Sequence, residues 1–331
     1  MMVNWLINPL QNPLTGPLTI LLGLLFGSAG LALAVYTLAQ RTRLTFVNGQ
    51  VKASSELKPL VEMPALIHTL WQRYRTWLII GLAVAGVVLS GPLTLAGLGA
   101  FLIWQGGREY AALVDLPELQ RRLLIGSGWL TLGGGLVFGP VALLYAPVLA
   151  FFGWAALALR PLAHEQAVGQ RFGTMTAGLW GYLYLGWLPA HLVGLGMSKM
   201  PGLVLAVALG VALSDIGAFC TGKLLKGPKL APNLSPNKTW GGVAGNFLGA
   251  ALALALLSFA LPGLEWWQFG GLTLVIGLGS IWGDLLESLL KRQHGVKDAG
   301  AILPGFGGLL DRIDSLLIVA PLVYYLALFS F

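Results

Sequence analysis

Charged residues are scarce in this sequence: Asp, Glu, Lys and Arg make up only 10% of its 331 residues, whereas hydrophobic residues make up 56%. A soluble globular domain carries about 25% charged residues, so the composition excludes that class of protein. Apolar runs long enough to cross a hydrocarbon core of about 30 Å recur along the chain, and the mean hydropathy is +0.78. We therefore expect an all-α, polytopic membrane protein.

Cysteine is nearly absent as well, since Cys220 is the single thiol. One thiol excludes an intramolecular disulfide, and we interpret Cys220 as a small packed residue rather than a nucleophile. The first residues contain no basic stretch before a short apolar core, so we expect no cleavable signal peptide. The net charge is +7. In a membrane protein such an excess is typical of cytoplasmic loops that face anionic lipid, so we expect no nucleic-acid partner.

Ten apolar segments are separated by Gly, Pro or charged residues. They cover residues 17–39, 77–90, 92–106, 122–138, 140–159, 174–197, 201–222, 242–262, 269–290 and 315–330. We expect about ten transmembrane helices, with nine as the lower bound. The second and third segments are short and are joined only by Ser90-Gly91-Pro92. This junction favours either a tight helical hairpin or one partly re-entrant segment.

Basic residues fall in alternate connections between these segments, so that every Lys and Arg except Lys199 lies on one face of the membrane. The positive-inside rule places that face in the cytoplasm and both termini on the other side. We expect a multi-pass protein of a bacterial inner (cytoplasmic) membrane, with its functional groups facing the cytoplasm.

The pattern divides the chain into three regions. Residues 1–76 combine one transmembrane helix with a polar cytoplasmic segment, residues 77–200 hold the middle spans, and residues 201–331 carry most candidate functional groups. In the polar segment, about residues 40–76, apolar positions recur at helical spacing. It is either an interfacial amphipathic helix on the cytoplasmic leaflet or an ordinary loop.

Asp215 lies inside the apolar segment 201–222, about two turns before a basic loop. A carboxylate at that depth costs several kcal/mol unless it is paired or bound to a cation, which makes it a functional candidate. The alternative is a structural hydrogen bond to a neighbouring helix.

The loop that follows, residues 223–242, is rich in lysine and lacks acidic residues, which suits phosphate oxygens or anionic headgroups. Its motif SPNKTWGG offers hydroxyl donors from Ser235 and Thr239 and a point charge from Lys238. The two glycines that end the motif would let a backbone approach a ligand as the next helix begins. The alternative is a basic loop with helix N-caps.

Carboxylates are concentrated near the C-terminus. Asp284, Glu287 and Lys291 fall at i, i+3 and i+7, on one face of a helix, and Asp311 and Asp314 are spaced i, i+3. Three aspartates that converge near a membrane face would repel one another unless a cation lies between them. Hard oxygen ligands beside lysines predict Mg²⁺ that clamps a polyphosphate, and the alternative is a pair of solvated helix ends.

These residues resemble a known family. Ser288-x2-Lys291-Arg292-x4-Lys297-Asp298, followed by Pro304-Gly305-x-Gly307-Gly308-x2-Asp311-Arg312-x-Asp314, is similar to the C-terminal signature of the phosphatidate cytidylyltransferases, also called CDP-diacylglycerol synthases. The upstream segments SDIGAFCTGKLLKG, SPNKTWGG and, near residues 106–113, GREYAAL also resemble segments of that family. The similarity is clear from about residue 205 to 325.

The resemblance implies an intramembrane enzyme of phospholipid biosynthesis that joins CTP and phosphatidic acid into CDP-diacylglycerol and releases pyrophosphate. It implies metal-facing, catalytic carboxylates at Asp284, Asp311 and Asp314, with Lys291 beside them. The implied substrate-binding residues are Asp215, Lys223, Ser235, Lys238, Thr239, Arg292, Lys297, Asp298 and Arg312. The resemblance further implies Mg²⁺, a monovalent cation such as K⁺, and a homodimer in the lipid bilayer.

Two positions depart from the family pattern: Phe306 stands where the family usually has His, and Gly241 where it usually has Glu. Each removes a polar side chain, so a non-catalytic paralogue remains an alternative. A CTP-dependent polyprenol kinase is a second alternative. A prenyltransferase would need two aspartate-rich motifs, of which the sequence has one. An ion-coupled transporter would use Asp215 and Asp284 near the midplane.

Overall fold

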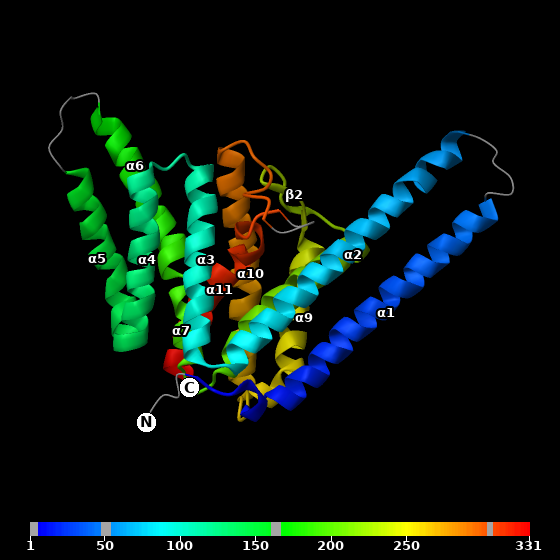
Figure 1. Cartoon of the computed structure of the whole chain (residues 1–331), viewed down its shortest axis with the longest axis horizontal. Helices are drawn as coiled ribbons and strands as arrows, with labels where there is room; N and C mark the ends of the chain where they lie inside the picture. Colours follow the sequence, from blue (N-terminus) through cyan, green and yellow to red (C-terminus); the bar gives the residue numbers. More distant parts are fainter. Residues whose placement is uncertain (1–5, 48–53, 160–166, 303–306) are drawn as a thin grey trace.

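The computed structural model describes residues 6–47, 54–159, 167–302 and 307–331, and these are mostly helical (Figure 1). The α-helices are α1 (Thr15–Val47), α2 (Ser54–Leu89), α3 (Pro92–Leu113), α4 (Glu118–Phe138), α5 (Pro140–Ala158), α6 (Ala167–Gly181), α7 (Ala190–Gly196), α8 (Gly202–Leu225), α9 (Trp240–Leu256), α10 (Trp266–Gln293) and α11 (Leu310–Ser330). Short 3-10 helices are η1 (Pro9–Gln11) and η3 (Ser258–Ala260), and η2 (Tyr182–Trp187) is a π-helix. Each of the ten apolar segments coincides with one of these helices or with a short run of them.

Five of the described helices are long and apolar enough to cross a membrane. They are α1, α5, α8, α10 and α11. Within a helix the backbone satisfies its own hydrogen bonds, which hydrocarbon requires, and large apolar side chains such as Leu130, Phe152 and Phe329 lie on the outside. The fold is that of a helical membrane protein, and the number of spans stays a prediction.

Glycine and proline end one helix and begin the next, as the sequence indicated. At Gly91 the φ angle is +101° and α3 begins with Pro92, while at Gly139 it is +61° and α5 begins with Pro140. A positive φ suits a residue without a Cβ, and proline tolerates the first helical turn, where its missing N–H is no loss. The second and third apolar segments therefore belong to two helices, α2 and α3, joined by a tight turn, and whether one of them is partly re-entrant stays a prediction.

Of the polar segment predicted at residues 40–76, residues 48–53 lie outside the described residues. From Ser54 onward it is neither a loop nor a separate interfacial helix, because α2 runs without a break from Ser54 to Leu89. It pairs with α1, and the two long helices lean away from the other helices (Figure 1). Tyr74 donates a hydrogen bond to the carbonyl of Phe26 at 3.1 Å, and the Trp71 indole donates to Thr37 at 3.2 Å. These contacts hold the part of α2 just before residue 77 against α1.

The sixth apolar segment was expected to be one helix, but it is divided into α6, the π-helix η2 and α7. A π-helix widens the helical turn and is frequent at functional sites. Here it presents Tyr182 and Tyr184 from one short stretch.

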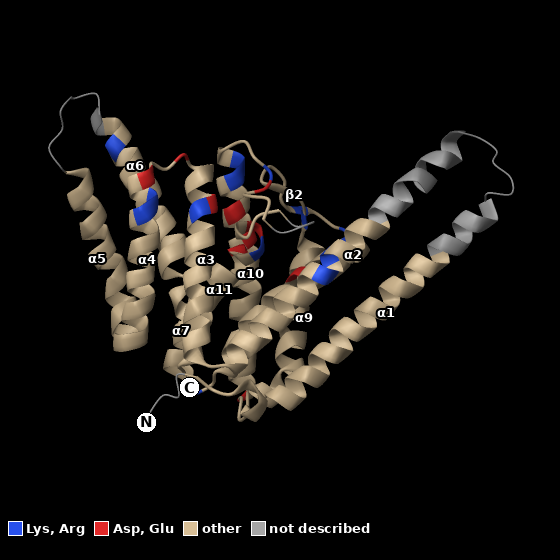
Figure 2. Ribbon diagram, in the orientation of Figure 1, with Lys and Arg blue, Asp and Glu red and all other residues tan. Residues whose placement is uncertain are grey.

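Among the described residues, most of the charged ones gather at one end of the helices, drawn uppermost in Figure 2. Both ends of the described chain lie at the opposite end: the amide of Ile7 donates to Ser90, and Lys199 donates to the carbonyl of Phe331. The structure thus shows the predicted separation of charge. Which end faces the cytoplasm stays a prediction.

Helices α8 and α9 pack with their backbones close together. A Cβ added at Gly245 would come within 2.3 Å of the carbonyl oxygen of Gly217, and one at Gly249 within 2.1 Å of that of Leu213. Small residues allow such an approach in membranes. Between the two helices, β1 (Lys229–Ala231) and β2 (Ser235–Thr239) form a short antiparallel hairpin, which the expectation of an all-α chain did not include.

Candidate active site

The candidate site is formed where α10 and α11 meet near their charged ends. Gly283 makes this approach possible, since a Cβ there would lie 2.5 Å from the Cα of Ser315 and 2.7 Å from the carbonyl oxygen of Asp314. The Ser315 hydroxyl donates to the carbonyl of Ser280 at 3.0 Å and fixes the crossing. The contact brings the side chains that follow Gly283 on α10 next to the first turns of α11.

Three carboxylates converge at this crossing. Oxygens of Asp284, Glu287 and Asp314 lie within 4.8 Å of one another, and we call these three residues the acidic cluster. Glu287 is only 2% exposed and Asp314 is also buried. Three negative charges at this spacing repel strongly in a medium of low dielectric constant, so the arrangement requires positive charge or protons close by.

Two lysines supply part of that charge. Lys238, carried by β2, forms an ion pair with Asp284. Lys291, one turn beyond Glu287 on α10, lies 2.7 Å from Glu287 Oε2 and 2.8 Å from Asp311 Oδ1. The lysines therefore contact the two carboxylates of α10 and leave Asp314 in contact with neither.

Asp311, which the sequence predicted as a metal ligand, is not one of the three residues of the acidic cluster. Its carboxylate instead accepts hydrogen bonds from a lysine and from backbone amides. Its carboxylate accepts from Lys291 at 2.8 Å, from the amide of Gly308 at 2.8 Å and from the amide of Ala299 at 3.0 Å. The structure thus brings Glu287, rather than Asp311, next to Asp284. A metal-binding role for Asp311 stays a prediction.

Glu109 of α3 is a site residue that the sequence did not single out. Its oxygens accept hydrogen bonds from the amides of Leu309 at 3.0 Å and Leu310 at 2.8 Å, and Gln105 donates to it at 2.8 Å. The first amides of a helix have no partner within it, and a negative charge there is favourable. Glu109 therefore holds the beginning of α11, which carries Asp314. The sequence signal that could have identified Glu109 was its position in GREYAAL, a segment that resembles the family.

Two buried oxygens at the site have no hydrogen-bond partner among the described residues: Oε1 of Glu287 and the hydroxyl of Tyr184. Tyr184 is 4% exposed and interacts electrostatically with all three residues of the acidic cluster. Buried polar groups are normally paired, with water or ions where protein atoms are lacking. The unpaired oxygens and three hard carboxylate ligands fit a divalent cation such as Mg²⁺.

Other predicted residues surround the cluster at different distances. Asp215 is exposed on α8 and interacts electrostatically with Asp284, Lys238 and Arg312. Lys223 lies farther along α8, with its Nζ 4.1 Å from the centre of the Phe219 ring.

The remaining predicted residues lie on the loop and the end of α10. Thr239 caps α9, since its hydroxyl accepts the amide of Gly242 at 3.2 Å. The structure leaves Ser235 half-buried on β2 and exposes Arg292, Lys297 and Asp298 beyond the acidic cluster. Phe306 lies outside the described residues.

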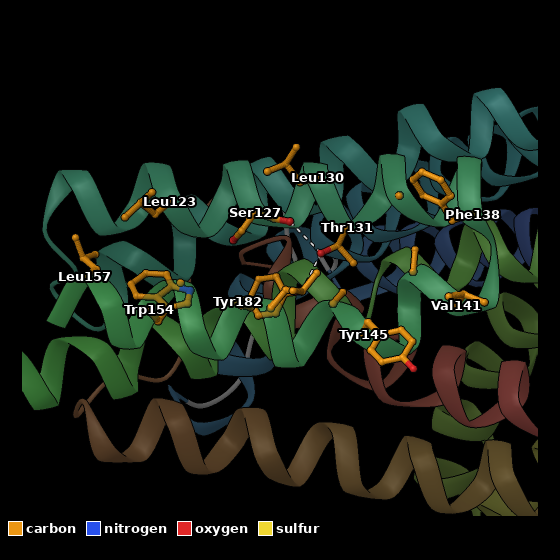
Figure 3. A pocket seen from close by; sticks show the side chains of 16 residues that line it. Leu123, Ser127, Leu130, Thr131, Phe138, Val141, Tyr145, Trp154, Leu157 and Tyr182 are labelled. Carbon is orange, nitrogen blue, oxygen red and sulfur yellow. Dashed lines mark hydrogen bonds between the residues drawn. The ribbon is translucent and has the colours of Figure 1, made fainter. Parts of the chain in front are cut away.

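A separate cavity of about 580 Å³ lies between α4 and α5 (Figure 3). Its walls are mainly apolar, and Thr131 and Tyr182, which hydrogen-bond to each other at 2.8 Å, contribute some of its few polar atoms. Tyr182 lines this cavity, whereas Tyr184 interacts with the acidic cluster. Without a charged group in its lining, the cavity suits hydrocarbon rather than a nucleotide.

Comparison with known proteins identifies the family of this chain. Residues 71–330 match the model of the cytidylyltransferase family. The chain belongs to this family. It is 45% identical over 111 residues to a phosphatidate cytidylyltransferase of Brucella suis, which covers 34% of this chain and 41% of the relative. It is 44% identical over 128 residues to a phosphatidate cytidylyltransferase of Staphylococcus aureus strain COL, covering 38% of this chain and 49% of the relative.

These alignments span less than half the length of each curated relative. The family match is broader, because it extends from the C-terminal half of α2 to the last residue of α11. Membership in the cytidylyltransferase family thus applies to the part of the chain that forms the acidic cluster, the β-hairpin and the contact of Glu109 with α11.

Proposed function

We propose that this protein is a phosphatidate cytidylyltransferase, which converts CTP and phosphatidic acid into CDP-diacylglycerol and pyrophosphate at the cytoplasmic face of a membrane. The family match and the names of the two relatives support this function. The observation that carries it is the acidic cluster with its two lysines, located at the charged end of a helical membrane protein.

The reaction needs two anions to be brought together. A phosphate oxygen of phosphatidic acid attacks the α-phosphorus of CTP, a new P–O bond forms, and the bond to the bridging oxygen of the β-phosphate breaks, so that pyrophosphate leaves with the electron pair. A phosphate oxygen is already a nucleophile near neutral pH, and no strong base is required. Positioning and charge stabilisation therefore supply most of the catalysis.

The residues divide this work by charge. Lys238 and Lys291 would bind phosphate oxygens of CTP as the nucleotide exchanges with their carboxylate partners. Asp284, Glu287 and Asp314 would hold Mg²⁺, which neutralises charge on a polyphosphate when bound. Asp311 would keep Lys291 in place through the hydrogen bonds described above, beside any direct role in metal binding.

The proposal includes further expectations from the family: a monovalent cation such as K⁺ beside Mg²⁺, a homodimer, and a site that faces the cytoplasm of a bacterial inner membrane. Phosphatidic acid would enter from the side, with its acyl chains still in the bilayer. Asp215, Lys223, Arg292 and Arg312 would contribute charge to substrate binding, with the other predicted residues.

The test uses purified protein in liposomes that contain phosphatidic acid, supplied with Mg²⁺ and with CTP labelled at either the α- or the γ-phosphate. A cytidylyltransferase transfers the α-label to lipid and releases the γ-label as pyrophosphate. Transfer of the γ-label to lipid would instead identify a CTP-dependent lipid kinase. Ion-gradient-driven flux without a lipid product would identify a transporter.

Matched variants connect the activity to the site. Asp314→Asn preserves the shape of the side chain but removes its charge from the acidic cluster, so turnover should fall by several orders of magnitude. Asp115→Asn makes the same chemical change at an exposed loop residue with φ of +50°, a conformation that Asn tolerates, and should retain activity. Wild-type incorporation by the Asp314→Asn protein would refute the assignment.

A further inference from the structure

A cavity of about 450 Å³ between α3 and α4 lies outside the candidate active site. Three of its lining residues are arginines, namely Arg108 of α3 and Arg121 and Arg122 of α4. Three guanidinium groups from two helices around one cavity form a strongly positive surface, at the end of the helices where charges gather (Figure 2). We call this the arginine cavity.

The arginines carry more positive charge than their neighbours balance. Glu118 contacts both Arg121, at 2.5 Å, and Arg122, at 2.7 Å, so one carboxylate serves two cations. Among the described residues Arg108 forms no ion pair. Its guanidinium instead lies 4.9 Å from the centre of the Trp104 ring. Stacking on an aromatic face leaves the N–H edge of the guanidinium available for a ligand.

Two tryptophans indicate at which level of the membrane the cavity lies. Trp104 and Trp129 both line it and both are exposed, and the Trp129 indole is fixed by donating to the carbonyl of Ala100 at 3.1 Å. Tryptophan is enriched at the membrane–water boundary, where its ring meets both hydrocarbon and headgroups. The arginine cavity thus has the composition of a headgroup-level site, with aromatic walls and cationic donors.

We propose that the arginine cavity binds the phosphate headgroup of an anionic phospholipid of the surrounding bilayer. Arginine binds phosphate oxygens through paired N–H donors. Both anionic and zwitterionic phospholipids offer such oxygens, but the arginines would repel the ammonium group of a zwitterionic headgroup, so an anionic headgroup fits better. The exposed tryptophans favour a lipid over free phosphate, since they give the glycerol and upper acyl chain an apolar contact.

This lipid site is distinct from the proposed catalytic site. Arg108 is exposed on one side of α3, whereas the next residue, Glu109, is buried on the other side and holds the amides of Leu309 and Leu310. A lipid on Arg108 therefore binds to the same turn of α3 that holds the beginning of α11. Its binding needs no nucleotide and can be measured without turnover.

The experiment is native mass spectrometry of the detergent-purified protein, titrated with phosphatidylglycerol and, separately, with phosphatidylcholine. The wild-type protein should retain phosphatidylglycerol preferentially. Arg108→Gln should weaken that binding about tenfold, as expected from the loss of one charged hydrogen-bond pair. Arg171→Gln, an arginine of α6 outside the arginine cavity, is the matched control and should bind as the wild type does.

Further arms make each result decisive. Arg122→Gln repeats the test at a side chain that is 76% exposed, so a loss of binding there cannot be attributed to misfolding. Millimolar inorganic phosphate should leave the bound lipid in place, and its displacement would overturn the choice of a lipid as ligand. Equal retention of both lipids, unchanged binding in both cavity variants, or an equal loss in Arg171→Gln would overturn the proposal.

Discussion

Replacement of Glu109 by Gln tests whether α3 holds the beginning of α11 in place. The glutamate is buried, and its two oxygens accept the amides of Leu309 and Leu310. Glutamine has nearly the same shape but only one acceptor oxygen. Its NH₂ group would face a backbone N–H, so one hydrogen bond is lost and two donors are opposed.

The expected cost follows from these contacts. A hydrogen bond to a charged group contributes about 1.5–3 kcal/mol, and a negative charge near a helix N-terminus adds about 0.3–1 kcal/mol. We therefore expect Glu109→Gln to lower the free energy of unfolding by about 2–4 kcal/mol. Turnover should fall as well, because Asp311 and Asp314 lie in the first turns of α11.

The assay is thermal unfolding of the purified protein, followed by intrinsic tryptophan fluorescence, together with CTP incorporation into lipid below the transition. Glu118→Gln is the control, since its surface ion pairs with two arginines are each worth about 0–1 kcal/mol. An unfolding temperature equal to that of the wild type would refute the assigned role of Glu109.

Three further substitutions probe the acidic cluster. Gly283→Ala should lower both thermal stability and CTP incorporation, because the added Cβ would lie 2.5 Å from the Cα of Ser315; wild-type incorporation would contradict the close crossing. Tyr184→Phe removes a buried hydroxyl that has no partner among the described residues, so the unfolding temperature should not fall. The Mg²⁺ concentration for half-maximal turnover should rise severalfold. An unchanged Mg²⁺ titration would exclude a role of this hydroxyl in the cation site. Lys238→Met removes the partner of Asp284, so we expect about a tenfold or greater rise in KM for CTP together with saturation at lower Mg²⁺. If the KM for CTP and the Mg²⁺ concentration needed for saturation both rose or both fell, Lys238 would not compete with Mg²⁺ for Asp284.

The course of the helices could be predicted well from the sequence where a glycine or proline ends an apolar run. Gly91 and Gly139 both adopt a positive φ and the next helix begins with proline, so the local residues alone determine these boundaries. The extent of α2 could not be predicted in the same way. Its N-terminal half is polar, and hydropathy does not distinguish a helix that continues beyond the apolar part from a loop or an interfacial helix.

The π-helix η2 left no signal that sequence reasoning could use. Gly181, Gly186 and Pro189 lie in or beside it, but these residues do not distinguish a widened turn from an ordinary helical one. Residues 174–197 were therefore predicted as one continuous segment. Residues two positions apart face different sides of any helix, but which of Tyr182 and Tyr184 meets the acidic cluster depends on how this segment packs. The buried tyrosine at the acidic cluster was therefore outside what periodicity can predict.

The glycines after Lys238 lie close to the backbone of α8. Gly241 and Gly242 were predicted to bring a backbone close to a ligand, and that stays a prediction. A Cβ added at Gly242 would lie 3.0 Å from the carbonyl oxygen of Ala218 on α8, and farther along α9 the same approach is made by Gly245 and Gly249. Their spacing of four residues places them on one face of a helix, which is the pattern for close helix packing in membranes. The packing supports Lys238 indirectly, since it fixes the helices that flank the hairpin on which this lysine lies.

The acidic cluster shows why spacing predicts a shared face but not the nearest neighbour. Asp311 and Asp314 are one turn apart, yet Asp311 lies in the first turn of α11, where the backbone amides that precede the helix are near and hold its carboxylate. Asp311 also contacts α10, through Lys291, whereas Asp314 is one turn farther from the backbone donors and lies beside both Asp284 and Glu287. Two carboxylates of the cluster thus come from α10 and one from α11. Their separation depends on how closely and at what rotation these helices meet, and the missing side chain of Gly283 sets that contact.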